Sequence, residues 1–79
     1  MYTNEMKRAV HSLETYKPKN FGLEIYDEGS FLSVVAPEKL FMNLLDEDKR
    51  RAVEYMVRVK KALEDNGAIV LLVRQGGAE

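Results

Sequence analysis

The sequence predicts a small α+β domain, with a three-stranded sheet and helices packed mainly on one face of that sheet. Apolar residues recur at the spacing of an amphipathic helix near the start of the chain and again over residues 47–65. Residues 21–26 and 31–35 have the composition of two strands, and the turn between them indicates a hairpin. Residues 68–73 then form an unbroken apolar run, which has the length of a buried strand rather than of a membrane helix.

The composition is typical of one folded domain. The chain has 79 residues, of which 46% are hydrophobic and 32% are charged. A chain of this size buries roughly 60% of its unfolded surface and often gains stability by association. Cysteine is absent, which excludes disulfides and thiol chemistry and suits a reducing compartment. We therefore expect a cytoplasmic protein without a membrane segment, with one domain over residues 1–75 and a flexible tail over residues 76–79.

Caps and turns set the expected bounds of the first elements. Thr3 is a suitable cap for a first helix that extends to about Tyr16. Pro18 then ends the helix, because the residue before a proline avoids the helical conformation. Residues 21–26 alternate between apolar and polar side chains, as in a strand with one buried face. Gly29 lies in the following turn, where a positive φ is expected.

The long helix is expected from about Glu47 to Asp65, after a short helix that begins near Pro37. Asp46 is expected to cap it, and Asn66–Gly67 is a strong stop signal. Its buried stripe is expected to consist of Ala52, Tyr55, Met56, Val59, Ala62 and Leu63, widened by Val53 and Val57.

The order of the strands in the sheet follows from two possible positions of the last strand. It can pair antiparallel with residues 21–26, or parallel with residues 31–35 after a right-handed crossover. We favour the first arrangement, which puts residues 21–26 at the centre of the sheet. In both arrangements the strand over residues 69–73 lies at an edge, where Arg74 is the only nearby charge. An apolar edge of this kind invites pairing with another chain.

The sequence contains no recognisable catalytic, metal or cofactor motif. The acids Asp46–Glu47–Asp48 suggest a cation site, but adjacent helical positions point in different directions, so we interpret them as helix-capping residues. His11 has no neighbouring nucleophile or orienting group, which favours a solvated histidine. We therefore expect a protein that is not an enzyme, and a hydrolase or metal enzyme is the least favoured class.

The apolar run near the C-terminus has more hydrophobic side chains than one sheet face can bury. If Ile69, Leu71 and Val73 line the core, Val70 and Leu72 lie on the outer face, and exposed apolar patches commonly mark interfaces. The residues expected in this interface are Tyr26, Phe31, Val35, Val70 and Leu72. The sequence therefore predicts a non-catalytic protein-interaction module, acting as a homodimer or as a small accessory or regulatory subunit.

The alternative prediction is a nucleic-acid-binding module. Residues 21–48 are strongly acidic and residues 49–62 strongly basic, so two basic helices could form a positive surface. The basic residues expected to contact phosphates are Lys7, Arg8, Arg50, Arg51, Arg58 and Lys61. The element order is similar to that of the type II KH domain, an RNA-binding family that clamps the nucleic-acid backbone with a GXXG loop. The corresponding residues here are Leu45–Asp46–Glu47–Asp48, which include no glycine and three acids that repel phosphates.

Overall fold

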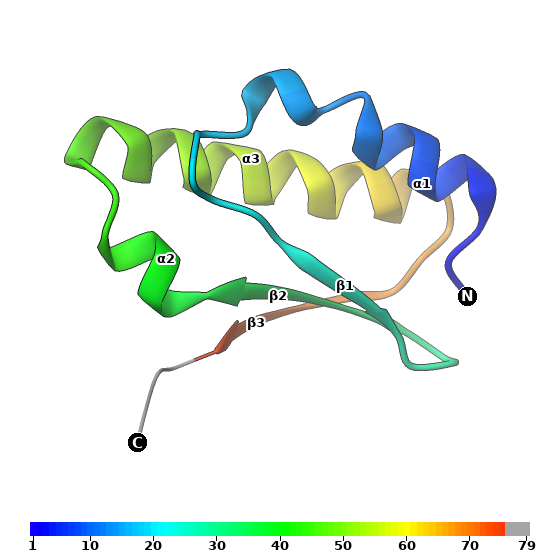
Figure 1. The fold of residues 1–79 in the computed structure, drawn as a ribbon. Coiled ribbons are helices and arrows are strands. Elements are labelled where there is room, and N and C mark those ends of the chain that lie inside the picture. The colour runs from blue at the N-terminus through cyan, green and yellow to red at the C-terminus, as the bar shows by residue number, and fades with distance from the viewer. Residues whose placement is uncertain (76–79) are drawn as a thin grey trace.

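The protein is an α+β domain with a three-stranded mixed sheet, described by a computed structural model over residues 1–75 (Figure 1). Residues 76–79, which the sequence predicts to be a flexible tail, lie outside the described residues. The elements in chain order are α1 (Asn4–His11), the 3₁₀ helix η1 (Glu14–Tyr16), β1 (Glu24–Asp27), β2 (Leu32–Pro37), α2 (Glu38–Met42), α3 (Asp46–Asp65) and β3 (Val70–Gln75).

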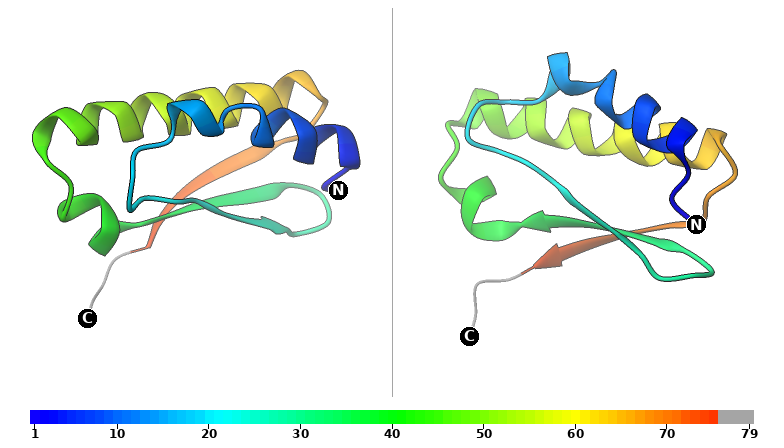
Figure 2. Two further views of the ribbon diagram at one scale, coloured as in Figure 1. Left: turned by 45° about the horizontal axis from the view of Figure 1, so that its top comes forward. Right: turned by 45° about the vertical axis from the view of Figure 1, so that its right-hand side comes forward.

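The domain has two layers. The helices α1 and α3 lie side by side over one face of the sheet, and all views place the sheet beneath them (Figures 1 and 2). Among the described elements, none covers the opposite face, which we call the outer face. The long helix α3 runs back over the sheet in the direction opposite to β3 (Figure 1). This one-sided cover confirms the predicted fold class and leaves a sheet face open.

The strand order β1-β2-β3 differs from the arrangement that we favoured. The prediction that residues 21–26 form the central strand is wrong, because β2 pairs with both neighbours. β1 pairs antiparallel with β2, and β3 pairs parallel with β2. The physical reason is that β2 is the fully buried strand: residues 32–36 are all buried, whereas β1 carries charge at both of its ends. The strand with no exposed residue takes the centre.

The register of β3 places its side chains in the opposite phase from the one expected. Val70 pairs with Leu32 and Leu72 pairs with Val34, and both partners belong to the core that faces the helices. Val70 and Leu72 therefore point toward the helices, and the prediction that they lie on the outer face is wrong. Leu71 and Val73 take the outer face instead. The chain does not enter β3 until Val70, one residue later than expected.

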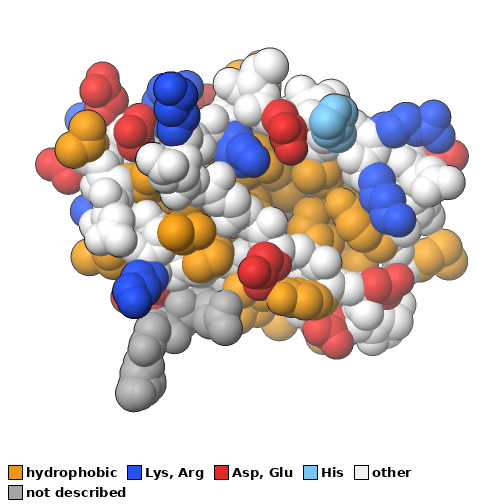
Figure 3. Space-filling view, viewed as in Figure 1, with side chains coloured by type: hydrophobic (Ala, Val, Ile, Leu, Met, Phe, Trp, Pro, Cys, Tyr) orange, Lys and Arg blue, Asp and Glu red, His pale blue; other side chains and the backbone are white. Residues whose placement is uncertain are grey.

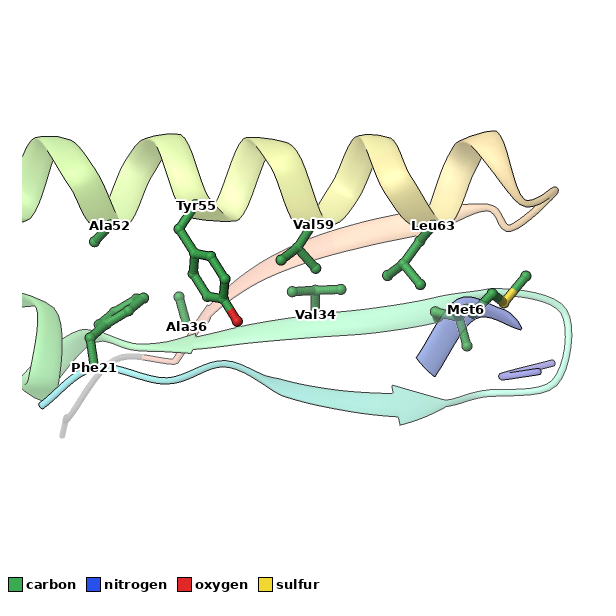
Figure 4. Packing of buried hydrophobic residues seen from close by; sticks show 9 residues of the cluster. Met6, Phe21, Val34, Ala36, Ala52, Tyr55, Val59 and Leu63 are labelled. Atoms are coloured by element: carbon green, nitrogen blue, oxygen red, sulfur yellow. The ribbon is translucent and has the colours of Figure 1, made fainter. Parts of the chain in front are cut away.

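The core lies between α3 and β2 (Figure 4). Four α3 residues point from the helix toward the sheet, and Val34 and Ala36 rise from β2 to meet them. Phe21, Met6 and the partly buried Leu23 and Ile25 close the cluster from the sides. The buried α3 residues are Ala52, Tyr55, Val59 and Leu63. Burial raises the pKa of Tyr55, because the ionised phenolate would lose its hydration.

The helix ends follow the sequence signals with two exceptions. Thr3 caps α1 through a hydrogen bond from the Met6 N–H to its Oγ1 (3.2 Å), and Gly67 follows α3 with φ +93°. However, α1 ends at His11, and the residues before Pro18 form the separate η1 turn. Asp46 was predicted to cap α3, but it is the first helical residue, and Leu45 occupies the cap position. Within residues 1–75, the structure contains no helix long and apolar enough to cross a bilayer.

Candidate interaction surface

The free edge of β3 is open and apolar. The Leu32 N–H donates to the Ile69 carbonyl (2.8 Å), which fixes the side of β3 that faces β2. Backbone groups of successive residues alternate between the two sides of a strand. The N–H and C=O groups of Val70, Leu72 and Arg74 therefore point away from the sheet. Arg74 is the only charged residue in this strand, and it interacts with Glu38 over 3.9 Å (Nε to Oε1).

The opposite edge of the sheet, at β1, is protected. This strand has only four residues, and it begins with Glu24 and ends with Asp27. Asp27 also holds the chain start against the hairpin, because its Oδ2 accepts a hydrogen bond from the Tyr2 N–H (3.0 Å) and its Oδ1 lies 3.3 Å from the Met1 ammonium. Short and charged edges resist pairing with other chains. The two edges of the sheet thus differ, because the β3 edge is open and apolar and the β1 edge is short and charged.

The outer face of the sheet continues the apolar character of this edge. The register places Val35 between Glu24 and Val73, and Ser33 between Tyr26 and Leu71. Leu71 is 52% exposed, whereas Ser33 and Val35 are shielded by the larger side chains beside them. The Tyr26 hydroxyl donates to Glu24 Oε1 (2.7 Å), and this bond to a carboxylate raises the pKa of Tyr26.

An apolar groove lies on the helix side of the same edge. It has a volume of about 290 Å³, and Leu72 and Arg74 of β3 form one wall. Val53 and Met56 of α3 form another. The prediction that Val53 and Val57 widen the buried stripe is wrong, because these residues are 47% and 57% exposed. Val53 lines the groove beside β3 and leaves apolar helix surface uncovered next to an uncovered strand, whereas Val57 is not among the residues that line the groove.

The structure brings the five predicted interface residues to four different places. Tyr26 and Val35 lie on the outer face, and Phe31 lines a shallow hollow at the start of β3. Val70 packs against the core, and Leu72 borders the groove with 42% exposure. The sequence reasoning missed the residues Ile69, Leu71, Val73, Val53 and Val57. The phase of β3 would have identified the first three, since Leu32 and Val34 alternate in step with Val70 and Leu72.

The predicted phosphate-binding residues do not form one basic surface. Acidic and basic side chains are interspersed across the helical layer (Figure 3). Arg58 donates to Glu54 (3.0 Å) and Lys61 donates to Asp65 (3.0 Å), while Arg51 interacts with Asp48 (3.9 Å). Lys7 of α1 lies over the Tyr2 ring, with 5.5 Å between Nζ and the centroid. Arg8 and Arg50 are exposed.

The other candidate chemistry has no built site in the described part of the chain. His11 is exposed at the end of α1. Asp46, Glu47 and Asp48 occupy the first turn of α3, where they face the positive end of the helix dipole. Residues 1–75 contain no group of three or more histidine or acidic side chains that could hold a metal ion. No family model, curated protein or solved structure matches the chain.

Proposed function

We propose that this protein is a non-catalytic interaction module whose partner is a second copy of the same chain, bound along β3. The observation that carries the proposal is the contrast between the two edges of the sheet. The β1 edge is short and charged, whereas β3 offers unpaired backbone groups between an apolar groove and an apolar outer face. A small domain with these features gains both hydrogen bonds and buried apolar area by pairing its edges.

Self-association is favoured over a different partner because the edge is compatible with itself. Each β3 carries one cation, Arg74, and this residue already interacts with Glu38 of its own chain. Two such strands in antiparallel arrangement bring no like charges directly opposite each other at their centre. A two-fold axis also makes every favourable contact occur twice, which is why closed dimers are the commonest protein assemblies.

Light scattering across a dilution series tests the proposal. We expect the wild-type chain to have the mass of two copies at high concentration and to dissociate on dilution. Replacing the exposed Ile69 and Leu71 by lysine should give a folded monomer. Leu45→Lys, at an exposed apolar position between α2 and α3, is the matched control and should remain dimeric. A wild-type chain with the mass of one copy at all concentrations overturns the proposal.

A further inference from the structure

We infer that the two copies pair through antiparallel β3 strands with Leu72 opposite Leu72 of the second copy, and that α3 of each copy packs beside α3 of the other. The inference rests on the proposed function and adds the register of the pairing. Its first basis is the set of backbone groups that point away from β2, which belong to Val70, Leu72 and Arg74. In an antiparallel ladder, residues with outward groups form the hydrogen-bonded pairs.

Only one two-fold register satisfies all of these groups. With the axis at Leu72, this residue pairs with its own copy, and Val70 pairs with Arg74 of the second copy in both directions. With the axis at Leu71, the outward groups of Arg74 find no partner among the outward groups of the second copy. With the axis at Val73, the same is true of the outward groups of Val70. An axis between two neighbouring residues places the outward groups of one copy opposite residues whose backbone groups point toward β2. The Leu72 register also brings Leu71 opposite Val73 on the outer face, so that two apolar faces join into one.

The flank of α3 provides the second basis, through charge complementarity. Steps of three and four residues place Lys49, Val53, Lys60 and Glu64 along one stripe of the helix. Met56 lies on the same flank and lines the groove with Leu72, so an axis through Leu72 passes close to Met56. Since α3 runs opposite to β3, this axis also makes the two α3 helices antiparallel (Figure 1).

The stripe is complementary to itself under that axis. A crossing point between Met56 and Val57 brings Lys49 near Glu64 of the second copy, once at each end of the helix pair. Met56 of one copy meets Met56 of the other in the middle, and Val53 lies opposite Lys60. Glu64 already accepts a bond from Lys60 of its own chain (2.6 Å), so the second cation would share a carboxylate held in place. The ends of the stripe thus carry opposite charges, with Val53 and the adjoining Met56 between them.

Single cysteine variants test the register, because the wild-type chain has no cysteine. Under mild oxidation, Leu72→Cys should form a dimer linked by a disulfide, since hydrogen-bonded pairs have Cα atoms about 5.5 Å apart and disulfides tolerate that distance. Leu71→Cys and Val73→Cys should form far less. Efficient linkage at Leu71 or Val73 instead overturns the register but leaves the homodimer in place. A monomeric wild-type chain overturns the proposed function itself.

Mixing two charge variants tests the helix contact. Lys49→Glu and Glu64→Lys should each weaken their own homodimer roughly ten-fold, because two attractive pairs become repulsive. A mixture of the two restores both attractive pairs, so native mass spectrometry should show mixed dimers well above the statistical half. Arg51→Glu with Asp65→Lys, on the other flank of α3, is the matched control. A statistical distribution for the Lys49 and Glu64 variants overturns the helix contact.

Discussion

The guanidinium carbon of Arg58 lies 4.0 Å from the centroid of the Tyr16 ring. The same side chain donates from Nη2 to Glu54 Oε2, one helical turn earlier in α3 (3.0 Å). Its Nε is buried and has no hydrogen-bond partner within the described residues. The ring therefore covers one part of the guanidinium while Glu54 binds another. This stacking joins η1 to α3 through Tyr16, which is 41% exposed.

The Arg58→Lys variant should lose about 0.5–1 kcal/mol of the free energy of unfolding. Lysine keeps the charge but lacks the planar group that stacks on Tyr16 and binds Glu54 at the same time. Urea denaturation measures the change. Arg50→Lys, at an exposed position of the same helix, is the matched control and should have almost no effect. Equal losses in the two variants would show that the stacking adds nothing.

Asp27 should make the stability of the domain depend on pH in the acid range. The Gly29 N–H donates to Oδ1 (2.9 Å) and lowers the pKa of Asp27, and the Met1 ammonium and Tyr2 N–H lower it further. A carboxyl with a lowered folded pKa adds stability above its unfolded pKa of about 3.9, and this stability is lost as the pH falls through the folded pKa. Asp27→Asn should therefore flatten the acid limb of melting temperature against pH. Glu28→Gln in the same turn is the control. An unchanged acid limb in Asp27→Asn contradicts the prediction.

Gly67 is required by the backbone rather than by space. Its φ is +93°, and a Cβ built there would meet nothing within 4 Å. Gly67→Ala should therefore cost about 1 kcal/mol through conformational strain at the end of α3. Gly22→Ala is a suitable control, because Gly22 also has open space but no positive φ. Strain predicts a lower melting temperature for Gly67→Ala than for Gly22→Ala. Equal melting temperatures in the two variants would exclude strain.

The core and the outer face should respond differently to truncation. Leu63 is fully buried between α3 and the sheet, so Leu63→Ala should lower the free energy of unfolding by about 2–5 kcal/mol. Leu71→Ala should lower it by less than about 0.5 kcal/mol in the single chain, because the side chain is already half exposed. Denaturation at low protein concentration makes the comparison. A large loss in Leu71→Ala would show that the outer face is covered within one chain.

The proposed function and the nucleic-acid alternative predict different results in a gel-shift assay, and the first of them predicts no binding. We expect no retardation of single- or double-stranded probes by micromolar protein at low salt. The reason is that three of the predicted phosphate-binding residues, Arg51, Arg58 and Lys61, are engaged with acids of α3. Phosphate contacts make affinity fall steeply with salt, so a shift that disappears on adding salt would favour nucleic-acid binding.

Local signals in the sequence were sufficient to predict the elements. Thr3 and Gly67 mark helix ends through side-chain capping and a positive φ, which depend on a few neighbouring residues. The buried stripe of α3 follows from helical spacing, except that Val53 and Val57 are exposed. Spacing indicates which residues share a side of a helix, but the width of the buried part depends on how far the sheet extends beneath it. Here the sheet ends at β3.

The order and phase of the strands could not be read from the same signals. The run from Ile69 to Val73 has no polar residue, so alternation gives no indication of which side chains face the helices. The phase comes instead from pairing with β2, where Val34 lies opposite Leu72. The candidate interface depended on that phase. Tyr26 and Val35 lie on the expected side of the sheet because their own strands contain polar or charged neighbours, but Val35 is only 9% exposed there.

The parallel pairing of β3 with β2 has a consequence for synthesis on the ribosome. The central strand β2 is translated well before its second neighbour, because α2 and α3 lie between them. Until β3 emerges, the nascent chain carries β2, the most buried strand of the folded domain, with one side unpaired. Pairings between segments distant in the chain also form slowly. During this time the unpaired side of β2 is accessible to chaperones and proteases. In a sheet made only of hairpins, each strand would pair soon after its synthesis.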